Sequence, residues 1–75
     1  MKTQEEILAA IYPVIRMHIA MGDRIRVSIE DQCIKVSDAA GNLGGSFTRD
    51  LAAVCTENAI CFSIRAKNNK PYILL

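Results

Sequence analysis

The sequence predicts a small α+β protein in the order αββαββ, with two helices packed on one face of a four-stranded antiparallel sheet. Three observations lead to this fold class. Apolar residues recur every three or four positions in the first 20 residues, apolar and polar residues alternate in two later pairs of segments, and a short helical pattern separates those pairs. The chain has 75 residues, of which 51% are hydrophobic, and a net charge of +1. These values favour one folded domain over residues 1–75 and argue against disorder.

The first helix begins at a capping box, Thr3-Gln4-Glu5-Glu6, and Gly22 is expected to end it in a left-handed conformation. Pro13 conflicts with a regular helix, because proline removes one hydrogen bond and clashes with the preceding turn. We favour one helix kinked at Pro13 over a break at Tyr12 followed by a second helix. The apolar positions form one broad arc: Ile7, Leu8, Ile11, Val14, Ile15, His18 and Ile19.

The next two segments predict a β-hairpin. Residues 24–29 and 33–37 alternate and are rich in β-branched side chains. A loop of two or four residues centred on Asp31-Gln32 sets Val27 opposite Val36 and Ile29 opposite Ile34. On this pairing we expect Ile25 and Val27 to be buried beneath the helices.

The second half repeats the pattern of one helix and one hairpin. After a loop over residues 38–46, Thr48 is expected to cap a helix that ends at Asn58, with an extended segment over 47–57 as the alternative. Residues 59–65 then alternate, and a turn over 67–70 leads into 72–75. Pro71 predicts that the last strand lies at a sheet edge. The expected inward residues and pairs are Ile60, Phe62 against Leu75, and Ile64 against Ile73.

No motif in the chain identifies a catalytic or metal site. Gly41-Asn42-Leu43-Gly44 matches the G-x-x-G clamp of KH domains only formally. We interpret Gly41 to Gly45 as a flexible connection, and the alternative is a loop that binds an anion through main-chain N–H groups before a helix. The acidic residue Asp50 falls in the first turn of the expected second helix, where a negative charge interacts favourably with the helix dipole, so it needs no catalytic explanation. His18, Cys33, Cys55 and Cys61 lack the close-spaced pairs of structural metal sites. We therefore expect no cofactor, no metal and no enzyme activity.

The amino-terminal apolar stretch resembles neither a signal peptide nor a membrane span. Glu5 and Glu6 stand where a signal peptide is positively charged, and Arg16 interrupts the apolar run well before about 18 residues. The three cysteines form no C-x-x-C pair, and their odd number favours a reducing compartment. We expect a cytoplasmic protein that does not associate with membranes.

The sheet face away from the helices is the candidate functional surface. Alternation places four positive charges and one aromatic ring there: Arg24, Arg26, Lys35, Arg65 and Tyr72. Our first interpretation is a non-catalytic module that binds an unidentified protein partner through this face. The alternative is RNA or single-stranded DNA binding, with phosphates on the cations and a base on the tyrosine. The apolar fraction of so short a chain is also compatible with a homodimer.

Overall fold

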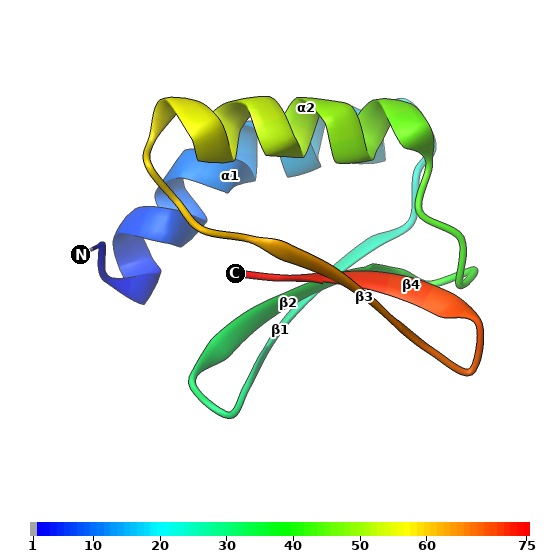
Figure 1. Cartoon of the computed structure of the whole chain (residues 1–75). Helices are drawn as coiled ribbons and strands as arrows, with labels where there is room; N and C mark the ends of the chain where they lie inside the picture. The colour runs from blue at the N-terminus through cyan, green and yellow to red at the C-terminus, as the bar shows by residue number, and fades with distance from the viewer. Residues whose placement is uncertain (1) are drawn as a thin grey trace.

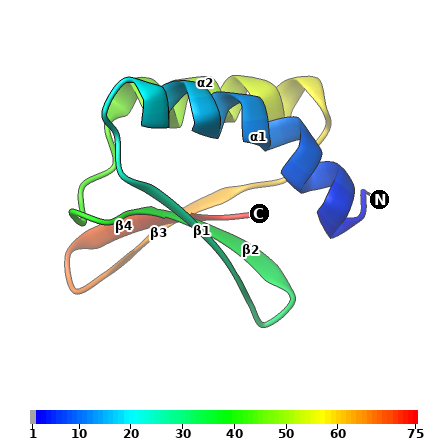
Figure 2. The same cartoon turned by 180° about the vertical axis from the view of Figure 1, so that it is seen from behind.

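A computed structural model describes residues 2–75. In chain order the elements are α1 (Gln4–Ala20), β1 (Ile25–Glu30), β2 (Cys33–Asp38), α2 (Gly45–Glu57), β3 (Ser63–Lys67) and β4 (Lys70–Leu74). The strands form one antiparallel sheet in the order β1-β2-β4-β3. Both helices lie side by side on one face of this sheet, and no other described element covers the opposite face (Figures 1 and 2). The predicted α+β fold in the order αββαββ is confirmed.

The helix α1 has the predicted ends and runs through its proline without a break. The Thr3 hydroxyl accepts a hydrogen bond from the Glu6 N–H, and the Glu6 carboxylate accepts one from the Thr3 N–H. Pro13 lies on the exposed side of the helix, whose first turns are inclined to the rest (Figure 2). At the other end Gly22 has φ +103°, and the N–H of Asp23 reaches back 2.9 Å to the His18 carbonyl. These features form a Schellman cap.

Each hairpin closes with a two-residue loop. Both residues of Asp31-Gln32 and of Asn68-Asn69 have positive φ, which identifies type I′ turns. The loops set the registers Val27↔Val36, Ile29↔Ile34 and Ile64↔Ile73, as the alternation predicts.

The prediction that β4 is an edge strand is wrong, because β4 lies between β2 and β3. Its pairing with β2 covers positions 72–74 and continues with two hydrogen bonds between Ile34 and Leu75. On the β3 side the pairing has the predicted register but begins at Ser63↔Leu74, so the expected pair of Leu75 with Phe62 lies one position beyond its end. Proline has no main-chain N–H to donate to a neighbouring strand. Pro71 nevertheless fits the central strand β4, because the pairing of β4 with β2 begins only at Tyr72 and requires no hydrogen bond from position 71.

The core lies between the helices and the two central strands. Val27 and Ile64 share a sheet face with the buried Val36 and Ile73, yet 39% and 57% of their surface is exposed. Their expected burial is wrong because they lie on the outer strands, beyond the cover of the helices. Ile29 and Phe62 are exposed as well, and Ile25 is half-buried. The buried apolar residues are Ile11, Val14, Ile15, Ile34, Val36, Phe47, Leu51, Cys55, Ile60 and Ile73.

The helix α2 exists as predicted but begins earlier. Its first residue is Gly45 and its N-cap is Gly44, whereas Thr48 was expected to cap it. Inside the helix the Thr48 hydroxyl donates instead to the Gly44 carbonyl at 3.1 Å. The early start brings Phe47 into the core, where none of its surface is exposed. The predicted end at Asn58 is confirmed.

No helix within residues 2–75 combines the length and the hydropathy that crossing a membrane requires.

Candidate binding surface

Side chains on the open face of the sheet form rows across the strands. Directly opposed residues of antiparallel strands point to the same side. The registers therefore join Arg26, Ser37, Tyr72 and Arg65 into one row across all four strands. The adjacent row contains Ser28, Lys35, Leu74 and Ser63.

Four of the five predicted site residues thus lie together on this face. The fifth, Arg24, lies one residue before β1, where its carbonyl accepts a hydrogen bond from the Ala39 N–H at 2.8 Å. Arg24 lines neither of the hollows of this face. Because Ile60 and Phe62 are the expected inward residues, alternation also predicts that Cys61 between them faces the open side, but β3 begins two residues later and Cys61 lies outside the strand.

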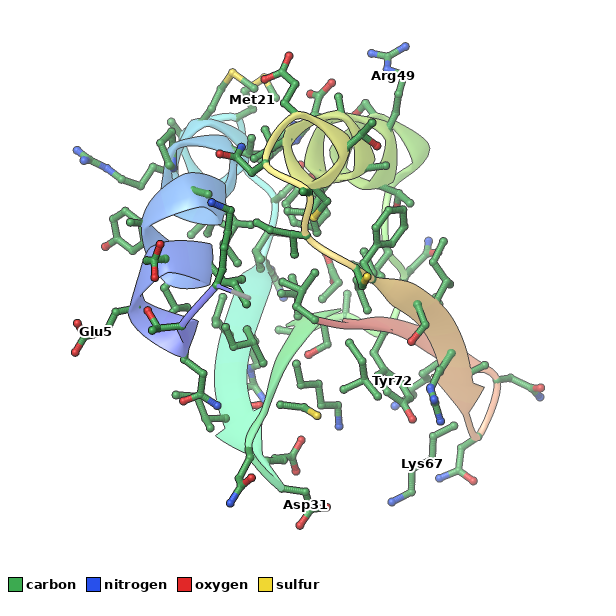
Figure 3. The ribbon with its side chains drawn as sticks, turned by 60° about the vertical axis from the view of Figure 1, so that its left-hand side comes forward. Glu5, Met21, Asp31, Arg49, Lys67 and Tyr72 are labelled. Carbon is green, nitrogen blue, oxygen red and sulfur yellow. The ribbon has the colours of Figure 1, made fainter. Side chains whose placement is uncertain are left out.

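The open face is concave. The two hairpins point away from the helices and diverge from each other (Figure 1). Two hollows of about 270 and 420 Å³ adjoin there and share Lys35, Lys67 and Tyr72. The first hollow also contacts Arg26, Ser37, Asp38 and Lys70, and the second contacts Glu30, Asp31, Cys33 and Leu74. Figure 3 shows Tyr72 and Lys67 on the side of the molecule away from the helices.

Lys35 lies at the centre of the concave face and has two partners. Its Nζ atom lies 4.8 Å from the centroid of the Tyr72 ring and 3.4 Å from a carboxylate oxygen of Glu30. The ammonium group is therefore positioned by a cation–π contact and an ion pair. One side of the tyrosine ring is consequently occupied by Lys35.

The remaining cations of this face lack acidic partners. Within residues 2–75, no carboxylate lies within 4.0 Å of the charged groups of Arg26, Arg65, Lys67 or Lys70. Lys67 and Lys70 are also directly opposed in the register of the second hairpin. Like charges in opposed positions destabilise a sheet, so this arrangement favours an added anion.

The glycine-rich loop supports one rim of the first hollow. The side chain of Asp38 accepts a hydrogen bond from the Ala40 N–H, and the main-chain carbonyl of Asp38 accepts one from the Gly41 N–H. Gly41 has φ +79°, and a Cβ atom there would lie 2.9 Å from Cδ of Lys70. The loop thus begins as a hydrogen-bonded turn against the lysine stem, which is a more constrained connection than the sequence suggested.

A second polar cluster, centred on His18, lies inside the protein. The imidazole is fully buried, with Nδ1 2.9 Å from Asp23 and Nε2 2.9 Å from Asp50. The Phe47 ring makes an edge-to-face contact at 5.2 Å between centroids. The hydrogen bond with Asp50 raises the pKa of His18, burial opposes this effect, and the hydrogen bond with Asp23 adds to it.

This cluster corrects the sequence-based interpretation of Asp50. The residue lies beyond the first turn of α2 and binds His18, so the helix dipole does not explain its position. Asp23 could have been suspected, because it follows the Gly22 cap close to a histidine on the buried arc. No local signal identified Asp50, which is 32 positions away. Both ring nitrogens are engaged, which gives the cluster a structural role between α1 and α2.

The cysteines form no disulfide in the described chain. Cys33 and Cys61 are exposed and Cys55 is buried, and burial raises the pKa of the Cys55 thiol. Residues 2–75 contain no group of three or more His, Cys, Asp or Glu side chains arranged to hold a metal ion.

Comparisons with known proteins find no relative. No protein-family model matches the chain, and neither curated protein sequences nor solved structures give a significant match.

Proposed function

We propose that this protein is a non-catalytic binding module whose open sheet face binds an acidic segment of a partner protein. The observation that carries the proposal is a set of four cations on this face that have no carboxylate within 4.0 Å among residues 2–75. Arg26, Lys67 and Lys70 line the adjoining hollows, and Arg65 lies outside them, opposite Tyr72 in the register. A partner that supplies carboxylates relieves the repulsion between Lys67 and Lys70 and gains charge-assisted hydrogen bonds.

The composition of the face favours a protein ligand. Leu74 and Cys33 add apolar surface to the second hollow, which suits side chains of mixed polarity. Tyr72 is the sole aromatic residue of the two rows, and Lys35 occupies one side of its ring. Nucleic-acid sheets use several exposed rings, because each stacked base needs a free π-face.

Single-stranded nucleic acid is the second candidate function. The row of Arg26, Tyr72 and Arg65 supports it, because two guanidinium groups flank an aromatic ring across the sheet. Such a row can contact phosphates on both sides of one stacked base.

A titration followed by NMR separates the two candidates. The probes are a short glutamate-rich peptide and mixed-sequence single-stranded RNA and DNA of similar charge, each added to the labelled protein at low salt. We expect the peptide to shift the resonances of Arg26, Lys35, Tyr72 and Lys70, with an affinity that falls steeply as salt is added. If only the nucleic acids bind there, the second candidate replaces the first. If no probe shifts these residues, both are discarded.

Two charge-reversed variants test the surface. Arg65→Glu/Lys70→Glu should abolish peptide binding, whereas Arg16→Glu on the exposed side of α1 should bind like the wild type. The same variants used as bait in a cell extract should separate a partner that needs this face from proteins that adhere nonspecifically. Equal binding by both variants would contradict the proposal.

The proposal also includes a cytoplasmic location. Three free thiols, two of them exposed, support it because a reducing compartment keeps such cysteines unpaired. Fractionation of the source cell should recover the protein with soluble cytoplasmic markers. Recovery in an oxidising compartment would contradict this part.

A further inference from the structure

Within residues 2–75, the main-chain groups on the outer edge of β1 have no hydrogen-bond partner, and the hairpin geometry shows which residues supply them. In a hairpin with a two-residue loop, the residues that flank the loop exchange both main-chain hydrogen bonds. Glu30, Ser28 and Arg26 therefore direct their N–H and C=O groups to β2, and the hydrogen bond from Ala39 to the Arg24 carbonyl has the same phase. Val27 and Ile29 consequently direct theirs outward, to the side where β1 has no neighbour.

The same edge exposes apolar side chains. Val27 and Ile29 are 39% and 55% exposed on the helix-facing side of the sheet. The start of α1 reaches only the turn that follows β1, where the Gln4 side chain donates to the Gln32 carbonyl at 2.6 Å. An open edge with exposed apolar residues is a template for a further strand.

The charges of β1 make it complementary to itself. Arg26 and Glu30 lie four residues apart on the open face, with Ser28 midway. In an antiparallel pair of two β1 strands centred on Ser28, Arg26 of each copy is opposite Glu30 of the other. Val27 of each copy is then opposite Ile29 of the other. These are the residues whose N–H and C=O groups point outward, so the two strands can exchange main-chain hydrogen bonds. One register satisfies the charges, the apolar side chains and the backbone together.

The other open edge, β3, does not have this property. Its charged residues are Arg65 and Lys67, both positive. A second β3 strand therefore brings only like charges to the shared edge, although Ile64 and Phe62 are exposed there. Lysine on an edge strand is a common protection against such pairing.

We propose that two copies of this chain pair through β1 about a two-fold axis at Ser28, forming one continuous eight-stranded antiparallel sheet. The Arg26–Glu30 pair forms twice, on the open faces, which lie on the same side of the joined sheet. The exposed Val27 and Ile29 side chains of both copies cover one another on the helix side. The proposed binding face is then doubled, although the pairing does not depend on what that face binds.

The first test is the mass of the protein in solution, by sedimentation or light scattering over a range of concentrations. We expect a concentration-dependent species of twice 8.3 kDa. Arg26→Glu and Glu30→Arg should each raise the dissociation constant about tenfold or more, because each places like charges in opposed positions twice. The double variant Arg26→Glu/Glu30→Arg exchanges the charges and should restore the dimer. Arg16→Glu is the matched control and should leave the dimer unchanged.

The second test locates the axis by cross-linking. Ser28 would oppose its own copy in a non-hydrogen-bonded pair, where Cα atoms are about 4.5 Å apart and a disulfide fits. In a background with Cys33→Ser and Cys61→Ser, the variant Ser28→Cys should form a covalent dimer on mild oxidation, and Ser37→Cys should not. A monomer at all concentrations, larger species from β1–β3 pairing, no rescue by the charge exchange, or equal cross-linking of both cysteine variants would overturn the proposal.

Discussion

The Nε2 atom of His18 lies 2.9 Å from a carboxylate oxygen of Asp50, and this contact joins the end of α1 to α2 inside the protein. Asp23 engages the other ring nitrogen at the same distance. A neutral imidazole carries only one N–H, so two carboxylate acceptors favour the doubly protonated ring. The cluster therefore couples the packing of the two helices to the protonation of a single histidine.

The stability of the fold should decrease as pH rises above about 6.5, because the folded state raises the pKa of His18 above its ordinary value of 6.5. A raised pKa means that the folded protein binds the proton more tightly than the unfolded chain. This stabilisation is complete below the unfolded pKa and is lost as pH rises through the folded pKa. Urea unfolding at a series of pH values measures it. As pH rises from the unfolded to the folded pKa of His18, the urea midpoint should fall in the wild type and stay level in His18→Gln. A wild-type midpoint that rises with pH would contradict this direction.

Asp50 should influence His18 more strongly than Asp23 does, because the Asp50 hydrogen bond is the largest cause of the raised pKa. We expect Asp50→Asn to lower the pKa of His18 more than Asp23→Asn. Near pH 6, Asp50→Asn should reduce the free energy of unfolding by about 1–3 kcal/mol. The chain has one histidine, so its NMR titration is unambiguous. Equal shifts in the two variants would contradict this ranking.

Two isoleucines on the same sheet face should differ strongly in their contribution to stability. Ile34 on the central strand β2 is fully buried, whereas Ile64 on the outer strand β3 is 57% exposed. Ile34→Ala should lower the free energy of unfolding by about 2–5 kcal/mol through lost burial and a cavity. Ile64→Ala should lower it by less than about 1 kcal/mol. Denaturant titration compares them, and similar losses would mean that β3 is covered in solution.

Lys67→Glu should stabilise the isolated protein while weakening its proposed binding. The substitution converts the opposed Lys67 and Lys70 pair into a pair of opposite charges, which is worth about 0.2–1 kcal/mol in a sheet. It also adds a negative charge to both hollows of the open face. Thermal unfolding and peptide titration measure the two effects, and Lys67→Gln should show smaller changes in both. A destabilised Lys67→Glu would show that the opposed lysines do not repel each other in the wild type.

Local patterns determined the elements and much of their pairing. The capping box at Thr3 and the apolar arc of α1 depend on neighbouring residues alone. The registers of both hairpins follow from matched apolar residues near a short turn, as Ile64 opposite Ile73 shows. The same alternation predicts that Arg26, Lys35, Arg65 and Tyr72 share one face, as the registers confirm, although what they bind stays a prediction.

The order of the strands and the extent of the helical cover depended on contacts between distant residues. Pro71 indicated an edge strand, yet β4 is central because the proline falls where the β2 pairing has already ended. Alternation marked Val27 as inward but could not show that the helices stop short of it. The contact of His18 with Asp50 likewise had no local signal. The sequence alone thus determined which face of the sheet each strand residue takes, because side chains alternate along a strand with a period of two. The tertiary structure decided which residues are covered, because cover depends on where separate elements meet.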